Sequence, residues 1–292
     1  MRALLLAGGL GSRLYPLTLA TSKQLLPVGD KPLIYYPLSV LMLAGIRDII
    51  LICNSSDVDS YKKLFGDGSE IGLSIVFVVQ PKPEGIAQAF LLAEEYIAGE
   101  HIALILGDNL FYGYGFSHLL KTVTHNQAGA TVFGYRVSDP ERFGVIECDN
   151  LGKAVSIEEK PKDPKSNYAV TGLYFYDSKV TGFAKDLVPS SRGELEITDI
   201  NRRYLEIQQL NVEILGRGFA WLDTGTHESI ADAGIFINSI ESRQGVKIAC
   251  LEEIAFRNEW IDLERLKHRC RLLADSNYGA YLNELVKELD SK

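Results

Sequence analysis

The sequence predicts an α/β fold, and three observations lead to this prediction. Apolar strand-like runs alternate with helix-like segments through the first half of the chain. Shorter strand-like runs follow from residue 130, and helical periodicity dominates beyond Arg243. Alternating strands and helices imply crossover connections between parallel strands. We therefore expect a Rossmann-like mixed, mainly parallel sheet flanked by helices, with an inserted sheet and a C-terminal helical segment.

The glycine-rich stretch after the first strand has the features of a phosphate-binding loop. The apolar run Ala3–Ala7 predicts one buried strand, and the sequence GGLG follows it. Glycines allow backbone N–H groups to approach an anion, and Arg13 and Lys23 add positive charge. An ordinary glycine turn is the alternative, because Leu14 breaks the dinucleotide fingerprint G-x-G-x-x-G and no G-x-x-x-x-G-K-[ST] loop is present. The two cations favour a polyphosphate site.

The first half continues with elements that place two loops at one edge of the sheet. Predicted helices cover residues 32–44, 58–65 and 86–97, and predicted strands cover residues 48–53, 73–79 and 101–106. The glycine loop follows Ala7 and Asp108 follows the strand that ends at Leu106, so both come after carboxyl ends of parallel strands. Ligands of such sheets bind beyond these ends. We expect the glycine loop and Asp108 to share one crevice.

The second half predicts an added mixed or antiparallel sheet and then helices. Strands are predicted over residues 130–137, 145–148, 154–158, 168–176, 211–215 and 220–222, and helices over residues 179–187, 199–206 and 226–240, the last capped by Thr226. Two later apolar stripes favour helices packed on the core rather than a cofactor site; they are Leu263, Leu266, Cys270 and Leu273, and Tyr278, Leu282, Leu285 and Leu289. We expect a core at residues 1–240 and a helical extension at residues 241–292 packed on it.

Composition and charge argue against several classes of function. The chain has 292 residues, 46% of them hydrophobic, and a formal net charge of −8, so we expect neither nucleic acid nor a membrane as a partner. Four cysteines and five histidines show no metal-ligand spacing, which favours a reduced, cytoplasmic protein. We expect no signal peptide, because the apolar start ends at Gly8, and no apolar run is long enough to span a bilayer.

Two aspartates that follow short apolar strands are candidates for a metal site. Asp108 follows residues 103–107, and Asp223 follows residues 220–222. Mg²⁺ prefers oxygen ligands and keeps waters and phosphate oxygens in the rest of its shell, so two carboxylates at strand ends make a plausible site. Each aspartate alone has an alternative role as a turn residue or a helix cap.

Two further polar segments have both a structural and a functional interpretation. The cluster Glu158–Pro161 contains Lys160 and, as a bare charge cluster, is typical of a solvated surface turn. The segment Gln80–Gly85 follows a strand and holds two prolines and a glycine, which predicts a rigid loop. A glutamine amide offers both a donor and an acceptor, as an imide base requires. An exposed glutamine in a surface turn is the alternative.

These motifs together resemble those of the sugar-phosphate nucleotidylyltransferases, the enzymes that make nucleotide sugars. The resemblance rests on residues 8–14 with Lys23 and Leu26-Pro27, and on the motifs Gln80–Gly85, Leu106–Asn109, Glu158–Pro161 and Trp221–Gly225. The later motifs are most similar to the glucose-1-phosphate thymidylyltransferase branch, and the match covers nearly the whole chain. Ser12 stands where many relatives have threonine and keeps the hydroxyl, whereas Phe143 stands where many have tyrosine and lacks it.

The resemblance implies an Mg²⁺-dependent enzyme that makes dTDP-glucose and diphosphate from dTTP and α-D-glucose 1-phosphate, the first step towards dTDP-L-rhamnose or a related deoxysugar. It implies that Asp108 and Asp223 hold the metal, that the inserted sheet binds the sugar, and that Arg13, Lys23 and Lys160 are catalytic. The implied nucleotide-binding residues are Gly8, Gly11, Ser12, Arg13, Lys23, Gln80, Gly85 and Asp108. The implied sugar-binding residues are Asn109, Gly144, Glu159, Lys160 and Val170, with Lys160 on the sugar phosphate.

The chemistry we expect is in-line attack of a sugar phosphate oxygen on the α-phosphorus of the triphosphate. The nucleophile is already anionic, so catalysis consists of positioning and charge neutralisation. Covalent catalysis is weakly supported, because no G-x-S-x-G motif and no triad-like histidine occurs. Two alternatives stay open: the same chemistry with UTP or another sugar 1-phosphate, and a non-catalytic nucleotide-sugar sensor. The presence of Arg13, Lys23 and both aspartates favours the enzyme.

The segment Lys247–Asp262 suggests an assembly with a second site. Its apolar residues are too many for a free tail, and a helix packed on the core is the structural interpretation. The resemblance implies in addition a homotetramer that is inhibited by dTDP-L-rhamnose at a site between subunits. The implied regulatory residues are Tyr114, Gly115, Glu253 and Arg257. Arg257 would pair with the diphosphate of the effector, as a guanidinium does well.

Overall fold

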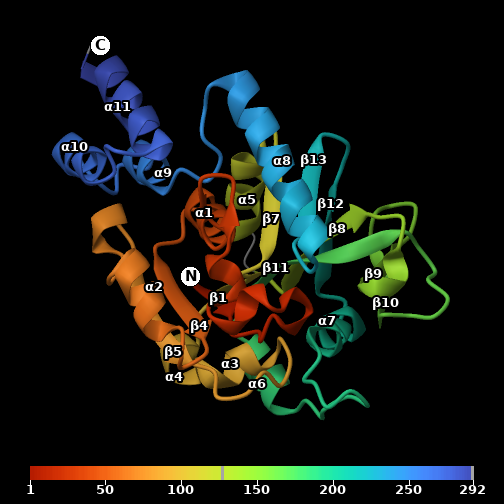
Figure 1. Ribbon diagram of the computed structural model, residues 1–292. Helices are drawn as coiled ribbons and strands as arrows, with labels where there is room; N and C mark the ends of the chain where they lie inside the picture. Colours follow the sequence, from red (N-terminus) through yellow and green to blue (C-terminus); the bar gives the residue numbers. More distant parts are fainter. Residues whose placement is uncertain (126–127, 291–292) are drawn as a thin grey trace.

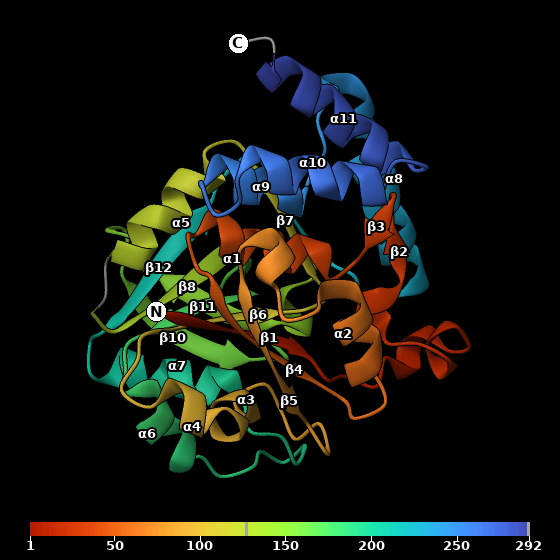
Figure 2. The same cartoon turned by 90° about the vertical axis from the view of Figure 1, so that its left-hand side faces the viewer.

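The structure is a computed structural model that describes residues 1–125 and 128–290 of the chain (Figures 1 and 2). The strands are β1 (Arg2–Ala7), β2 (Pro27–Val28), β3 (Lys31–Pro32), β4 (Asp48–Cys53), β5 (Ser74–Val79), β6 (Ile102–Leu106), β7 (Asn109–Gly113), β8 (Ala130–Arg136), β9 (Gly144–Cys148), β10 (Ala154–Glu159), β11 (Tyr168–Tyr176), β12 (Leu210–Leu215) and β13 (Phe219–Asp223). The helices are α1 (Tyr35–Leu43), α2 (Val58–Phe65), α3 (Gln88–Leu92), α4 (Glu94–Ile97), α5 (Phe116–His125), α6 (Val180–Lys185), α7 (Ile197–Glu206), α8 (His227–Gln244), α9 (Leu251–Arg257), α10 (Leu263–Leu272) and α11 (Asn277–Asp290). Within the described ranges, no helix is both long and apolar enough to cross a membrane.

A mixed sheet forms the centre of the molecule. Nine strands of the described chain take part, in the order β10-β9-β11-β6-β1-β4-β5, with β8 paired to β11 and β12 paired to β8. Strands β6, β1, β4 and β5 run parallel to one another, and β11 runs antiparallel to β6. The predicted α/β class is confirmed, and the carboxyl ends of β1 and β6 lie side by side.

The side chains of β1 alternate between two cores, as the pleat of a strand requires. Ala3, Leu5 and Ala7 pack in the core that also receives α1, α5 and the C-terminal helices. Leu4 packs in the core on the other face, together with α3, α6 and α7. Because helices cover both faces, the strand is apolar at every position from Ala3 to Ala7.

The inserted sheet from Ala130 onward is joined to the central strands through β11. Residues 173–176 of this long strand pair with β6, residues 168–170 and 174–176 pair with β8, and Ala169 also pairs with β9. In Figure 1 the hairpin of β9 and β10 lies at the opposite side of the molecule from α10 and α11. The insertion therefore extends the sheet beyond its parallel part, beside the carboxyl end of β6.

A separate two-stranded ribbon brings together Asp108 and Asp223, the two aspartates that were predicted to form a metal site. Strand β13 pairs antiparallel with β7, and Asp223 is the partner of Asn109 in that register. Asp108 directly precedes β7, so the pairing places it near Asp223 although the two are far apart in sequence. Thr226 then caps α8 through a reciprocal hydrogen-bond pair with Ser229, as predicted for its first turn.

The C-terminal helices pack on the core next to α1 (Figure 2). Both predicted apolar stripes belong to the core on that face or pack against it, which confirms their structural interpretation. Buried Glu252 accepts hydrogen bonds from Arg269 and from the hydroxyl of Tyr278. Buried Lys31 lies 3.0 Å from Glu241, and Lys247 lies 2.9 Å from the same carboxylate. The Lys31–Glu241 pair attaches the extension to the segment that follows Lys23.

Some predicted bounds are wrong. The helix predicted over residues 32–44 begins only at Tyr35, because Lys31 and Pro32 pair with β2. The helix predicted over residues 86–97 is two short helices that meet at Ala93, whose φ of −99° and ψ of 8° interrupt the first one. Helix α8 continues beyond residue 240 to Gln244, and Gly245 ends it in a left-handed conformation.

Two elements between residues 109 and 125 were not predicted. Strand β7 begins at Asn109, which looked like turn material, and it depends on pairing with the distant β13. Helix α5 buries Phe116, Leu120 and Val123, whose spacing is helical and is a signal that the sequence did contain.

Candidate active site

The glycine-rich loop after β1 turns sharply and lets a second segment approach its backbone. Gly11 has a φ of 61°, a conformation that favours glycine, and a short helical turn follows it at Ser12–Leu14. At Gly8, an added Cβ atom would lie 1.9 Å from Oε1 of Gln80. Glycine at this position therefore allows Gln80, at the end of β5, to lie against the carboxyl end of β1.

Lys23 and Asp108 form an ion pair where the loop faces β6. Lys23 Nζ lies 2.6 Å from Oδ2 of Asp108, and Lys23 is only 8% exposed. Oδ1 of Asp108 accepts a hydrogen bond from Asn109 Nδ2 at 3.0 Å. A buried ammonium needs such a counter-charge. The predicted meeting of the glycine loop segment with Asp108 is thus seen in the structure.

Asp223 is the second carboxylate of the same space. Burial, and then the nearby charge of Asp108, raise the pKa of its carboxyl to about 6, against the opposing effect of Lys23, Arg142 and Arg13. Two carboxylates that face each other repel, and a divalent cation between them would relieve the repulsion. No group of three or more metal-binding side chains is found in the part of the chain that the structure describes. The pair therefore fits Mg²⁺ only if waters and phosphate oxygens complete the shell.

Two cavities meet at Arg13 and Asp223. The smaller, about 220 Å³, is lined by Gly9, Gly11, Ser12, Arg13, Leu14, Lys23, Gln24, Asp108, Asp223 and Gly225. The larger, about 500 Å³, is lined from the inserted sheet and α7, by residues that include Arg13, Asn109, Arg142, Phe143, Gly144, Glu159, Lys160, Val170, Arg192, Thr198, Trp221 and Asp223. The structure therefore joins the predicted phosphate site to the predicted sugar site.

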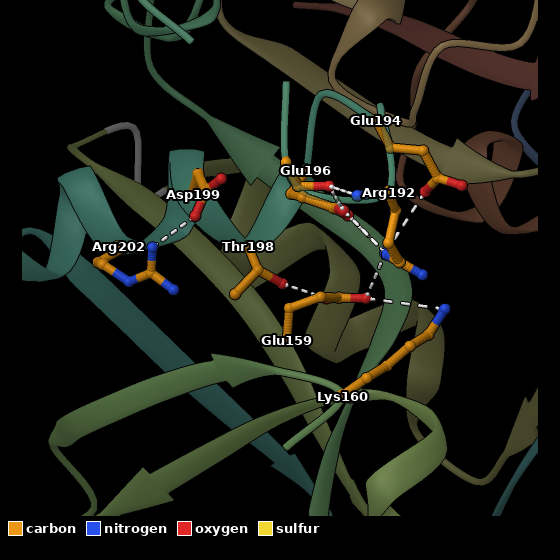
Figure 3. A network of polar contacts seen from close by, with 9 residues as sticks. Glu159, Lys160, Arg192, Glu194, Glu196, Thr198, Asp199 and Arg202 are labelled. Carbon is orange, nitrogen blue, oxygen red and sulfur yellow. Dashed lines mark hydrogen bonds and ion pairs between the residues drawn. The ribbon is translucent and has the colours of Figure 1, made fainter. Parts of the chain in front are cut away.

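The larger cavity ends in a network of charged side chains (Figure 3). Glu159 accepts a hydrogen bond from Thr198 at 2.6 Å through one oxygen, while the other lies 3.2 Å from Arg192 Nη2 and 3.9 Å from Lys160 Nζ. Arg192 also donates to both oxygens of Glu196, at 2.8 and 2.9 Å. Lys160 therefore lines the cavity, while its side chain stays 41% exposed to solvent. Cations beside carboxylates suit an anionic ligand that carries hydroxyl groups.

The other predicted sugar-binding residues line the same cavity. A Cβ atom on Gly144 would lie 3.2 Å from Oγ1 of Thr198, so the glycine leaves room beside Glu159. Val170 forms a buried wall from β11. Phe143 packs edge-on against Trp221 with ring centroids 5.2 Å apart. Asn109 also lines the cavity, but it is 1% exposed and its amide is bonded to the protein on both sides.

The cavity residues that were not singled out from the sequence as site residues include Arg142, Arg192, Thr198 and Trp221. Arg142 ends a short helical turn at Pro140–Arg142 and Arg192 lies in a loop, and a single charge at such a position carries no local signal. Thr198 lies in the first turn of α7, where a hydroxyl is common for structural reasons. Trp221 belonged to the motif Trp221–Gly225, but its own side chain had no assigned role. Only the tertiary fold brings these side chains to Glu159 and Asp223.

The segment Gln80–Gly85 is a constrained loop that is buried at Gln80 and exposed over residues 81–84. Gln80 is 3% exposed and donates to Gln88 at 2.7 Å, which excludes an exposed surface glutamine. Gly85 has a φ of 107°, and an added Cβ atom would lie 2.4 Å from the carbonyl oxygen of Leu195. The loop is therefore held between α3 and the segment before α7, beside the glycine loop at Gly8.

The four predicted regulatory residues lie elsewhere, and the linings of the two cavities include none of them. Tyr114 is fully exposed between β7 and α5, next to Gly115. On α9, Arg257 donates to Glu253 at 2.7 Å, and its side chain is 67% exposed. The side chains of Tyr114 and Arg257 are therefore accessible to a partner. The regulatory role of the four residues stays a prediction.

Comparison with known proteins decides the family. The family model described as nucleotidyl transferase matches residues 2–239. The chain belongs to the nucleotidyl transferase family. It is 58% identical over 288 residues to the glucose-1-phosphate thymidylyltransferase of Neisseria meningitidis, covering 99% of this chain and 100% of the relative. It is 51% identical over 287 residues to the enzyme of the same name from Mycobacterium tuberculosis, covering 98% and 99%.

Solved structures agree with this family. A Bacillus anthracis protein described as a glucose-1-phosphate thymidylyltransferase, in complex with a sucrose, has a TM-score of 0.74 and 45% identity and covers 81% of this chain and 94% of its own. A UDP-glucose pyrophosphorylase complexed with UDP-glucose has a TM-score of 0.73 at 24% identity, covering 83% and 99%, and shows the shared fold. The chain is therefore a nucleotidyltransferase, as the sequence motifs predicted, and the non-catalytic sensor is not supported.

Proposed function

We propose that this nucleotidyltransferase makes dTDP-glucose and diphosphate from dTTP and α-D-glucose 1-phosphate. The observation that carries the proposal is the junction of the two cavities at Arg13 and Asp223. Two anionic ligands, one in each cavity, would bring their phosphates together at this junction. Relatives that are 51 and 58% identical over nearly the whole chain carry the name glucose-1-phosphate thymidylyltransferase, which supports these substrates.

The reaction is a displacement at the α-phosphorus of dTTP. An oxygen of the sugar phosphate forms the new P–O bond, the bond from the α-phosphorus to the bridging oxygen breaks, and diphosphate leaves with that electron pair. The attacking oxygen is anionic, so no side chain has to remove a proton. The protein must align two anions and offset the repulsion between them.

The phosphate end of the site supplies positive charge. Arg13 lies at the junction, where it would offset charge on the reacting phosphates, and Lys23 would hold the diphosphate. The loop at Gly11 and Ser12 would offer backbone N–H groups to the triphosphate. Asp108 and Asp223 would hold Mg²⁺, the general requirement of nucleotidyltransferases. When bound, this ion supplies charge neutralisation on phosphate oxygens.

The sugar end orients the nucleophile. Lys160 would bind the sugar phosphate, and Arg192 beside it offers a second cation of the kind that pairs well with phosphate. Glu159 would accept hydrogen bonds from sugar hydroxyls through Oε1, the oxygen that also faces Arg192 and Lys160. Gly144 and Val170 would shape the wall against the ring, and Asn109 lies beside them.

The base end is formed by Gln80 and Gly85. The amide of Gln80 would pair with the imide edge of thymine, for which it has both a donor and an acceptor. Gly8 permits this position of Gln80, and Gly85 holds the loop where a larger residue would strike Leu195.

The assembly we propose is a homotetramer with a regulatory nucleotide-sugar site between subunits. Full exposure of Tyr114 and the exposed guanidinium of Arg257 support a surface that a partner subunit and an anionic effector complete. The test is inhibition by dTDP-L-rhamnose in wild type and in Arg257→Ala, with the subunit mass measured alongside. A monomer, or competitive inhibition that Arg257→Ala leaves unchanged, would remove this site.

The experiment for the main reaction is diphosphate release with glucose 1-phosphate and Mg²⁺. Each nucleoside triphosphate is supplied in turn, and each of several sugar 1-phosphates is tested with dTTP. We expect the highest kcat/KM with dTTP and glucose 1-phosphate, and almost no turnover in Asp108→Asn or Asp223→Asn. A clear preference for UTP or for another sugar 1-phosphate would replace the substrates named here.

A further inference from the structure

Asn109 is buried between the two cavities and uses its amide to connect three parts of the site. Its Nδ2 donates to Oδ1 of Asp108 at 3.0 Å. Its Oδ1 accepts from the indole N–H of Trp221 at 2.6 Å and from the backbone N–H of Gly172 at 3.0 Å. Glycine is required at 172 for this contact, because an added Cβ atom would lie 2.5 Å from Asn109 Oδ1.

The ribbon of β7 and β13 explains why these groups meet. Asn109 is the register partner of Asp223, and Trp221 stands two residues before Asp223 on the same strand. Cross-strand partners share a face, and residues two apart on a strand share it too. Asn109, Trp221 and Asp223 therefore lie on one face of the ribbon, with Asp108 directly before it.

The orientation of the Asp108 carboxylate depends on this amide. One oxygen of Asp108 is taken by Lys23, at 2.6 Å, and the other by Asn109. The Asn109 amide cannot flip by 180°, because its oxygen accepts two hydrogen bonds and an amide nitrogen in that position could not accept them. Because the carboxylate is already fixed in this orientation, it loses little rotational freedom when it binds a divalent cation.

We propose that Asn109 is a positioning residue, which, held by Trp221 and Gly172, orients Asp108 and so sets how tightly the Asp108–Asp223 pair binds the divalent cation. The inference rests on the proposed function, because that function makes the two aspartates the metal ligands. It goes beyond the sugar contact expected for Asn109. Since Trp221 and Gly172 line the larger cavity, the wall of the sugar site is thereby connected to the metal site.

Two substitutions test the connection from different sides. Asn109→Ala removes the donor to Asp108 and adds no charge. Trp221→Phe keeps an aromatic ring, although a smaller one, and removes the N–H that holds Asn109. Tyr135→Phe is the matched control, because Tyr135 packs edge-on against Trp221 but its hydroxyl donates only to the carbonyl of Phe219.

The first measurement is Mn²⁺ binding to each protein without substrates, followed by the EPR signal of the free ion. We expect binding to weaken about tenfold or more in Asn109→Ala, as for other partners of metal ligands. A loss of about threefold is expected in Trp221→Phe, and none in the control. The Mg²⁺ concentration for half-maximal activity should rise in the same order.

The outcomes separate this inference from the alternatives. If both variants fold, as judged by thermal unfolding, bind Mn²⁺ within twofold of wild type and differ only in KM for glucose 1-phosphate, then Asn109 is a sugar contact and the inference is wrong. If Asn109→Ala does not fold, Trp221→Phe decides the question alone. Failure of the wild type to make dTDP-glucose would instead refute the proposed function, and Mn²⁺ binding would still test Asn109.

Discussion

The Asp223 carboxyl should destabilise the metal-free protein at neutral pH, by an amount that the structure allows us to estimate. Its pKa is raised from 3.8 to about 6, first by burial and then by Asp108. The folded protein then binds more protons than the unfolded chain between these two pH values, so stability falls as the pH rises through this window. One pKa unit is worth about 1.4 kcal/mol, so the loss above pH 6 reaches up to about 3 kcal/mol.

The perturbation that exposes this effect is Asp223→Asn, which keeps the shape and removes the charge. In EDTA at pH 8 the variant should be more stable than the wild type by up to about 3 kcal/mol, a gain of several degrees in Tm for a chain of this size. At pH 4 the gain should nearly vanish, because the wild-type carboxyl is then protonated in the folded state. Turnover should be almost lost at every pH.

The assay is calorimetric or urea unfolding at pH 4, 6 and 8, in EDTA and in Mg²⁺. Mg²⁺ should stabilise the wild type and leave Asp223→Asn unchanged, because the ion binds the folded site only when both carboxylates are present. Asp199→Asn is the control, since Asp199 pairs with Arg202 on the surface and should change stability little. If Asp223→Asn were less stable than the wild type at pH 8 in EDTA, or if its gain did not depend on pH, the reasoning would be refuted.

Three further predictions concern other parts of the molecule. Lys160→Ala should raise KM for glucose 1-phosphate at least tenfold, and Arg13→Ala should chiefly impair dTTP use, because a charged phosphate contact is worth roughly 1.5–3 kcal/mol. Steady-state kinetics with each substrate varied in turn measures both effects. If each variant affected both substrates equally, this division of roles would be contradicted. Gly85→Ala should lower Tm and weaken dTTP binding in a calorimetric titration, since its Cβ would lie 2.4 Å from Leu195, and an unchanged affinity would remove the loop from the base site. Glu252→Gln should lower the free energy of unfolding in urea by about 3 kcal/mol, because Arg269 loses its buried counter-charge, and a loss below 1 kcal/mol would mean that the pair contributes little.

Local sequence predicted much of the sheet and one half of the site. The run Ala3–Ala7 and the alternation that follows it depend on short-range periodicity, and the strands they predict are present. The prediction that the glycine loop and Asp108 share one crevice followed from a general rule, that loops after parallel strands gather at one edge. The first inference uses only residues close to the position concerned, and the second adds the order in which strands and helices alternate along the chain.

The rest of the site depends on pairings that no local pattern contains. Strand β7 was missed because Asn109 is good turn material by itself, and its extended conformation comes from β13. Arg192 meets Glu159 only because a loop of the insertion folds over the cavity. The burial of Gln80 likewise depends on Gln88 and on the missing Cβ of Gly8. In each case tertiary contacts override the local propensity.

The ribbon of β7 and β13 also has a consequence for how the protein is made. Strand β13 is synthesised after the whole inserted sheet. The Asp223 carboxylate therefore becomes available to Asp108 only when most of the chain has left the ribosome. Pairings between segments so distant in sequence form late in folding, because their loop-closure entropy must first be offset by other contacts. A nascent chain that already displays the glycine loop and Lys23 therefore still lacks Asp223. Its reactive centre is assembled only when the fold is nearly complete.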